Sequence, residues 1–106
     1  MLPEMIVLTA QTFHERVATT DCLVLTFRKN CPNCQVLGKV INKCRHLFPD
    51  LGLAGVDADE NASLLADLAI TKVPTVLVYR RGAIAARRSG VMNPAELSML
   101  VASTGA

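Results

Sequence analysis

The strongest constraint on the fold is a continuous apolar run, Cys22–Phe27, that leads within a few residues into a helical pattern. Five of its six residues are apolar and the other is a threonine, which is typical of a central strand covered on both faces. From residue 34 onward, apolar residues recur at spacings of three and four, which predicts a helix from Asn33 to Phe48 with one apolar stripe. The stripe consists of Cys34, Val36, Leu37, Val40, Ile41, Cys44, Leu47 and Phe48.

A Cys-x-x-Cys motif lies where the strand gives way to the helix. Cys31 is expected at the N-cap, with its sulfur near the unpaired N–H groups of the first turn, and Pro32 at the first helical position. The positive end of the helix, together with nearby Arg28 and Lys29, should lower the pKa of Cys31 below the ordinary value of about 8.5. Cys34, one turn into the helix, points inward and should stay protonated until it attacks. This arrangement suits reversible disulfide chemistry.

Four further segments have the composition of strands. They are Met5–Leu8, Leu51–Val56, Thr75–Tyr79 and Ala83–Arg88. The first is wholly apolar, so we expect a short buried strand. Arg81 and Gly82 separate the last two, which predicts a tight turn and an antiparallel hairpin.

Three more helices are expected, capped by Thr9, Asn61 and the pair Asn93-Pro94. The resulting order, β-α-β-α-β-α-β-β-α, predicts an α/β fold. Its central mixed sheet would contain parallel strands and a C-terminal antiparallel hairpin, with helices on both faces. The inward-facing residues are Phe13 and Val17 in the first of these helices, Leu64, Leu65 and Leu68 in the second, and Leu97, Leu100 and Val101 in the last.

The length predicts a single domain spanning residues 1–106, and the composition, with 51% hydrophobic and 19% charged residues, predicts a globular chain. A net charge of +2 is too small to indicate nucleic-acid binding. No apolar run approaches the ~20 residues that cross a bilayer, and the start, Met1–Glu4, lacks the basic region of a signal peptide. We therefore expect a cytoplasmic monomer with no membrane contact, and in that reducing compartment a Cys-x-x-Cys is typically redox-active or metal-binding.

In these respects the chain resembles the thioredoxin family, and the resemblance covers nearly the whole sequence. The family's active site, a Cys-x-x-Cys after the second strand, matches Cys31 and Cys34. The family's cis-proline, which faces the active site and starts the hairpin, matches the proline of Val73-Pro74-Thr75. Its hairpin glycine matches Gly82, and the glycine that lines its substrate groove matches Gly90. The implied substrate-binding residues are Asn30, Pro32, Val73, Pro74 and Gly90.

The departures from the family pattern concern specificity and rate. Thioredoxins usually carry Trp before the first cysteine and Gly-Pro between the pair, where this chain has Asn30 and Pro32-Asn33. The family's buried acid corresponds to Leu25, and the lysine that accompanies it corresponds to Gly55. We therefore expect a narrow partner range, with Arg28, Lys29 and Lys72 steering an acidic partner, and slow attack by the second cysteine.

The resemblance implies a thiol–disulfide oxidoreductase in which Cys31 attacks a substrate disulfide and Cys34 resolves the mixed disulfide. Its substrates would be a restricted set of disulfide-containing proteins, and its electron donor a flavin-dependent thioredoxin reductase or glutathione. It would need no cofactor besides its own Cys31–Cys34 disulfide. Cys-Pro-x-Cys also occurs in glutaredoxins and in periplasmic oxidases, so a glutaredoxin-like protein, or an electron carrier dedicated to one partner, is the alternative.

Two other classes stay open at this point. Cys31, Cys34, Cys44 and His46 offer four metal donors, but Cys34 and Cys44 lie about 15 Å apart along one helix, too far for Zn–S bonds of about 2.3 Å. We therefore expect no metal within one chain, although two chains sharing their Cys-x-x-Cys pairs could bind one. A non-catalytic binding module is the third class.

Cys22 and Cys44 are interpreted as core residues, with a regulatory role as the alternative.

Overall fold

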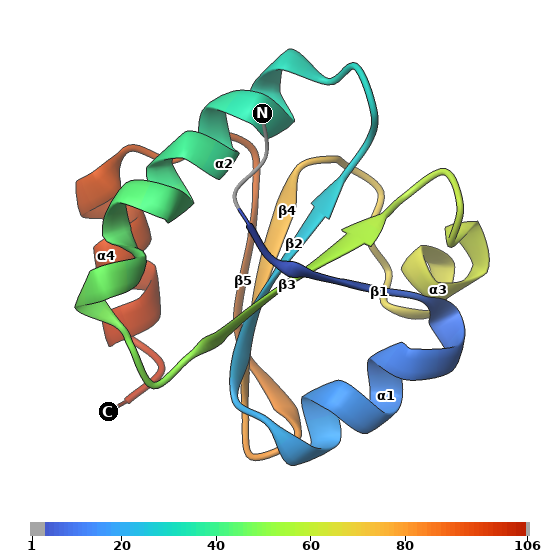
Figure 1. Ribbon diagram of the computed structural model, residues 1–106, viewed down its shortest axis with the longest axis horizontal. Coiled ribbons are helices and arrows are strands. Elements are labelled where there is room, and N and C mark those ends of the chain that lie inside the picture. The colour runs from blue at the N-terminus through green and yellow to red at the C-terminus, as the bar shows by residue number, and fades with distance from the viewer. Residues whose placement is uncertain (1–3, 106) are drawn as a thin grey trace.

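The computed structural model describes residues 4–105 and has the predicted order of elements (Figure 1). The strands are β1 (Ile6–Leu8), β2 (Cys22–Phe27), β3 (Gly52–Asp57), β4 (Thr75–Arg80) and β5 (Ala83–Ser89). The helices are α1 (Ala10–Thr19), α2 (Pro32–Cys44), α3 (Ala62–Asp67) and α4 (Pro94–Ala102), with a 3₁₀ turn, η1 (Arg45–Leu47), directly after α2. Met1, Leu2 and Pro3, on which the expectation of no signal peptide partly depends, lie outside the described residues. No helix within residues 4–105 has both the length and the apolarity that a membrane span requires.

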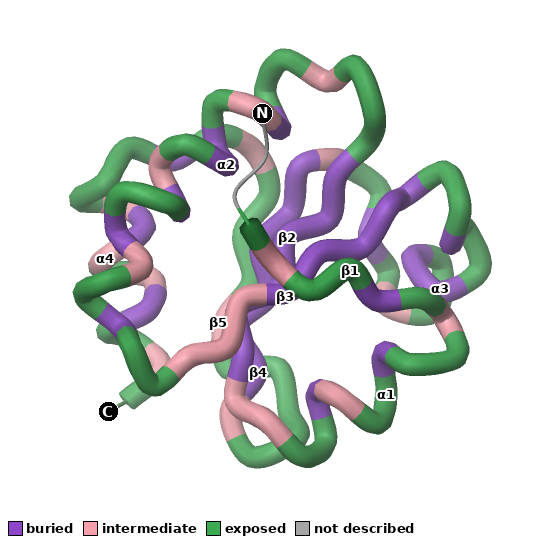
Figure 2. The backbone as a smooth tube through the Cα atoms, viewed as in Figure 1, coloured by how far each residue is buried: buried purple, intermediate pink, exposed green. Residues whose placement is uncertain are grey.

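The sheet has the order β1-β3-β2-β4-β5 and is mixed, as predicted. β2 and β1 run parallel to β3, whereas β4 runs antiparallel to β2 and to β5. α1 and α3 cover one face of the sheet and α2 and α4 the other (Figure 1). β2 lies between β3 and β4, and all six of its residues are buried (Figure 2). The strand that precedes the Cys-x-x-Cys motif is therefore held on both sides and on both faces.

The apolar stripe of α2 is confirmed except at two positions. Cys34, Leu37, Ile41 and Cys44 are buried, but Val36 and Leu47 are 47% and 60% exposed. Val36 lies about 100° around the helix from Leu37, at the edge of the stripe. Leu47 is turned outward because the α-helix ends at Cys44 and the chain continues as a 3₁₀ turn with a different angle per residue.

The prediction of a buried first strand is wrong for two of its residues. Ile6 and Val7 in β1 are 48% and 58% exposed, and Leu8 alone in that strand is buried. β1 forms one edge of the sheet and pairs with β3 only, so its outer side has no strand beside it. Its length of three residues limits how much unpaired edge it presents.

The hairpin turn and the start of α3 lie where the sequence places them. Arg81 and Gly82 have φ angles of 54° and 79°, as a two-residue type I′ turn requires. Asn61 precedes α3, but its side chain links other elements instead of capping the helix. Its Oδ1 accepts the Ala10 N–H at 3.0 Å, and its Nδ2 donates to the Asp57 carbonyl at 2.9 Å. Asn61 thus joins the start of α1 to the end of β3.

We expect Ala69→Gly to stabilise the protein. Ala69 follows α3 with a φ of 56°, in a Schellman motif closed by Ile70 N–H to the Leu65 carbonyl at 2.9 Å. The left-handed conformation destabilises the folded state by about 1–2 kcal/mol for a residue with a Cβ, and glycine removes this cost. Glycine also increases the entropy of the unfolded chain, which offsets about 0.4–1 kcal/mol of that gain. The net gain should raise Tm by roughly 3–6 °C in thermal unfolding. The control Ala66→Gly, inside α3, should lower Tm, and a lower Tm for Ala69→Gly would contradict the argument.

Candidate active site

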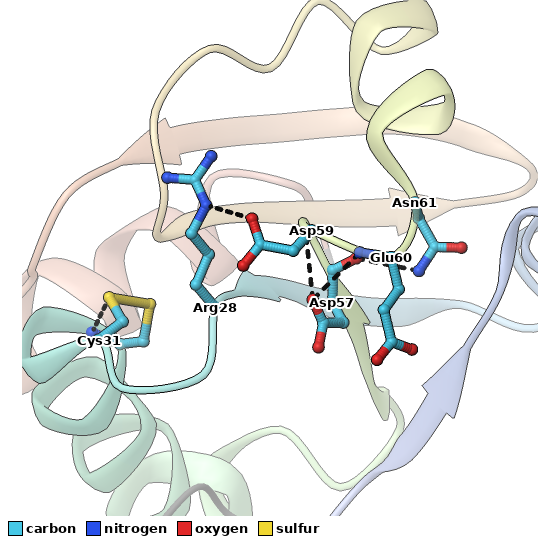
Figure 3. Close-up of polar contacts among 7 residues, drawn as sticks. Arg28, Cys31, Asp57, Asp59, Glu60 and Asn61 are labelled. Atoms are coloured by element: carbon cyan, nitrogen blue, oxygen red, sulfur yellow. Dashed lines mark hydrogen bonds and ion pairs between the residues drawn. A yellow bond between two sulfur atoms is a disulfide. The ribbon is translucent and has the colours of Figure 1, made fainter.

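Cys31 and Cys34 form a disulfide at the N-terminus of α2, with their Cα atoms 5.2 Å apart. Cys31 is the N-cap residue, and its Sγ accepts the backbone N–H of Cys34 at 3.2 Å (Figure 3). Pro32 occupies the first turn, where it leaves no N–H unsatisfied. Cys31 is partly exposed and Cys34 is fully buried, so the predicted placement of both sulfurs is confirmed. Among the hydrogen bonds of residues 4–105, the Cys34 N–H is the one from the first turn of α2 that reaches the Cys31 sulfur.

Asn30 has a structural role in the turn between β2 and α2, in addition to the predicted role at the substrate groove. Its φ of 57° lies in the left-handed region, which asparagine adopts more readily than most residues with a Cβ. The chain turns here from the end of β2 towards the first cysteine. Asn30 is exposed, so its polar side chain stands where the family usually has a large aromatic one.

The two basic residues before the motif are paired with acids from the segment after β3. Arg28 Nε lies 3.0 Å from Asp59 Oδ1 (Figure 3). Lys29 Nζ lies 3.2 Å from Glu60 Oε2. Asp57 Oδ1 accepts the backbone N–H groups of Asp59 and Glu60 at 2.9 and 3.4 Å, which fixes the turn that presents both acids. The hydrogen bond to Glu60 raises the pKa of Lys29, with a smaller coulombic contribution from the same carboxylate.

This pairing weakens the basis for the expectation that Arg28 and Lys29 stabilise the Cys31 thiolate and steer an acidic partner. Exposed ion pairs of this kind contribute little to stability, but each acid offsets the positive charge beside it. Stabilisation of a Cys31 thiolate therefore depends mainly on the α2 N-terminus, through its partial positive charge and the Cys34 N–H. Steering of an acidic partner stays a prediction, with exposed Lys72 as its third basic residue.

The Val73–Pro74 peptide bond is cis, as predicted, and Pro74 is buried directly before β4. The Pro74 carbonyl accepts the Gly90 N–H at 2.8 Å, which brings these two predicted groove residues together. The φ angle of Gly90 is 91°, a conformation that favours glycine. The space beside its Cα is open, because a Cβ built there would lie more than 4 Å from every atom of residues 4–105. Val73 and Cys31 are partly buried residues packed against the same apolar cluster. The position of Pro74 opposite the sulfurs stays a prediction.

The surroundings of Cys34 are apolar. Leu25 and Gly55 are paired in register across β2 and β3, at the positions where the family has its acid and lysine. A Cβ on Gly55 would lie 2.5 Å from Met5 Cε and 3.1 Å from Phe27 Cε1, so the Met5 side chain occupies the space of a larger residue. Leu25, Phe27 and Cys34 belong to one buried cluster, against which Met5 packs.

The other two cysteines are core residues, as predicted. Cys22 and Cys44 are free thiols with 1% and 3% exposure, and they lie in the apolar clusters on opposite faces of the sheet. Burial raises the pKa of Cys22 to about 11, so this thiol is protonated at neutral pH. Neither cysteine belongs to a metal-binding group, because residues 4–105 contain no cluster of three or more His, Cys, Asp or Glu side chains placed to hold an ion.

A disulfide at a helix start, on a five-stranded mixed sheet covered by helices on both faces, defines a dithiol–disulfide protein of the α/β class. The thioredoxin family model matches residues 4–103, and the chain belongs to the thioredoxin family. Thioredoxin-1 of Saccharomyces cerevisiae is 25% identical over 96 residues, which cover 90% of this chain and 92% of that protein. Thioredoxin of Mycoplasmoides gallisepticum is 27% identical over 86 residues, covering 80% and 86%.

The fold is also that of a solved structure. A chain from a study of the thiol resolving mechanism in yeast mitochondrial 1-Cys peroxiredoxin via glutathione/thioredoxin systems superposes with a TM-score of 0.82. The match covers 91% of this chain and 92% of that one, at 18% sequence identity. The predicted thioredoxin fold is therefore confirmed.

Proposed function

We propose that this protein is a thiol–disulfide oxidoreductase that reduces disulfides in protein partners. The Cys31 thiolate would attack one sulfur of a substrate disulfide, forming a mixed disulfide and releasing the other substrate sulfur as a thiolate. Cys34 would then lose its proton and attack Cys31, forming the Cys31–Cys34 disulfide and releasing the second substrate sulfur. Two electrons and two protons pass to the substrate. The observation that carries the proposal is the Cys34 N–H directed at the sulfur of the partly exposed Cys31, which is bonded to the sulfur of the fully buried Cys34.

The substrate would bind beside Cys31 as an added strand. Within residues 4–105, Val73 takes part in no main-chain hydrogen bond outside the helices and strands, so its N–H and carbonyl are available to an extended partner. Pro74 and Gly90, joined by their hydrogen bond, would continue this surface, and Pro32 and Asn30 would border it on the side of α2. The open space above Gly90 supports a chain passing close to its backbone.

The electron source would be a flavin-dependent thioredoxin reductase or glutathione. Membership of the thioredoxin family supports the first, and the Cys-Pro-x-Cys sequence keeps the second as an alternative. The exchange would need no cofactor, because the two cysteines supply both electrons. We place the protein in the cytoplasm as a monomer, where the dithiol would be kept reduced.

We infer that the partner range is narrow. Asn30 adopts a left-handed conformation and exposes a short polar side chain, so it cannot supply the broad aromatic contact usual in the family. Fewer apolar contacts would remain to hold unrelated partners, and recognition would depend more on the fit to individual side chains. A panel of unrelated disulfide proteins reduced at equal rates would contradict this inference.

The proposal is tested by a coupled turnover assay. The protein is offered a generic protein disulfide, with either thioredoxin reductase and its nicotinamide donor or glutathione and its reductase as the source of electrons. Turnover with the first supports a thioredoxin-type cycle, and turnover with glutathione alone supports the glutaredoxin-like alternative. Absence of turnover with both, in protein whose Cys31 and Cys34 thiols oxidise readily, would contradict the proposed activity.

The order of alkylation tests the assignment of the nucleophile. Limited alkylation of the reduced protein near neutral pH, followed by peptide mass analysis, should label Cys31 first. Cys31 is partly exposed and lies at the helix start, whereas Cys34 is fully buried. Preferential labelling of Cys34 would reverse the two roles.

A further inference from the structure

A buried hydroxyl lies where β2 and β4 stop pairing. The last register pair of these strands is Thr26 with Thr75, and Thr75 directly follows Pro74. Thr26 Oγ1 accepts the Thr75 N–H at 2.9 Å and donates to the Thr75 carbonyl at 3.0 Å. Thr26 is 1% exposed and Thr75 is fully buried. One side chain therefore satisfies both main-chain polar groups of the residue after Pro74.

A second hydroxyl closes the segment that carries Val73 and Pro74. Thr75 Oγ1 donates to the Lys72 carbonyl, three residues earlier, and lies 2.8 Å from Ser89 Oγ. The single hydroxyl proton of Thr75 is used towards Lys72, so Ser89 donates to Thr75. Ser89 is the last residue of β5 and the register partner of Thr75, next to the Gly90 N–H that binds the Pro74 carbonyl.

The presence of a hydroxyl at residue 26 has no packing explanation. Thr26 is the sole polar residue of β2, and valine has nearly the same shape without the cost of burying an oxygen. A buried hydroxyl is retained at little cost only where its hydrogen bonds are made, and both of those seen here go to the Thr75 main chain.

We propose that Thr26 is a positioning residue for substrate binding. This role rests on the proposed function. The Thr26 hydroxyl would hold the Lys72–Thr75 segment in position, and the main chain of Val73 in that segment would pair with the substrate. A segment fixed before binding avoids the entropy cost of being ordered by the partner. The side-chain hydrogen bonds of Thr26 go to the Thr75 main chain and not to a sulfur. Thr26 would therefore affect protein disulfides that use the strand edge and not small disulfides that reach Cys31 directly.

The test is Thr26→Val, assayed with a protein disulfide and with a small aromatic disulfide. We expect kcat/KM for the protein disulfide to fall roughly tenfold, mainly through a higher KM, because a displaced binding segment weakens alignment. The second-order rate with the small disulfide, and the alkylation rate of Cys31, should change less than about twofold. Thr26→Ser keeps the hydroxyl and should restore most of the lost kcat/KM.

Val24→Ala provides the matched control. Val24 is fully buried in the same strand and packs with the same cluster as Cys22 and Leu77, so its truncation lowers stability without removing a hydrogen bond to Thr75. An equal loss of kcat/KM in Val24→Ala would assign the effect to stability and overturn the proposal. Equal losses with both substrates in Thr26→Val would also overturn it. Failure of the parent protein to reduce either disulfide would instead contradict the proposed function.

Discussion

Cys34→Ser is expected to abolish turnover while leaving capture of a substrate disulfide intact. Cys31 remains at the α2 N-terminus with the N–H of residue 34 directed at its sulfur, so the first attack proceeds. The mixed disulfide then has no intramolecular thiol to resolve it and accumulates. Non-reducing electrophoresis and intact mass should show a covalent complex near full occupancy, with turnover at the uncatalysed rate.

The control variants test the role of each of the four cysteines. Cys31→Ser should give neither turnover nor a covalent complex. Cys22→Ala and Cys44→Ala remove thiols that lie in the apolar clusters, so they should lower stability while turnover persists. A covalent complex formed by Cys31→Ser and not by Cys34→Ser would overturn the assignment of the two roles.

Leu25→Asp is expected to accelerate resolution of the mixed disulfide by roughly tenfold at neutral pH. Cys34 lies in a buried apolar cluster with Leu25 and Phe27, and such surroundings disfavour the thiolate that must attack. A carboxylate at residue 25 would supply a base behind Cys34. Single-turnover release of a labelled substrate thiol from the preformed mixed disulfide measures the step directly.

Leu25→Asn is the matched control for this prediction. It has the size of aspartate and buries a polar group at a similar cost, about 1–3 kcal/mol when unpaired, but it cannot accept a proton. Both variants must first be shown to be folded by thermal unfolding. Resolution that is no faster in Leu25→Asp than in Leu25→Asn would mean that the missing acid does not limit the cycle. Gly55→Lys would complete the family pattern, but it requires Met5 to move, because a Cβ there approaches Met5 Cε to 2.5 Å.

The strands and helices around the motif could be predicted because their signals are local. The apolar run of β2 and the spacing of Leu37, Ile41 and Cys44 in α2 each identify an element without knowledge of the rest of the chain. The exposure of Val7 could not be predicted in this way, because an apolar segment of three or four residues does not reveal whether it forms a central or an edge strand. The exposure of Leu47 could have been predicted only if the end of the α-helix had been located to within one turn.

The polar contacts of the site could be predicted only in part. The capping of α2 by Cys31 could be predicted from the neighbouring residues, and the place of Gly90 in the groove from the family pattern. The Arg28–Asp59 pair joins residues 31 positions apart, and the Thr26–Thr75 bonds span 49 positions. Such contacts depend on strand order and register, which the sequence of either partner does not contain.

The ion pairs beside the motif affect how a partner first meets the protein. Arg28 and Lys29 are matched one for one by Asp59 and Glu60, so an approaching molecule encounters two small dipoles near Cys31 instead of a basic patch. A dipole's field falls off faster with distance than that of a net charge, and at physiological salt the Debye length is about 8 Å. With exposed Lys72 as the third basic residue of the predicted set, we expect diffusional encounter closer to the unsteered range, about 10⁵–10⁶ M⁻¹s⁻¹, than to the steered one. We therefore expect discrimination between partners to take place mainly after contact.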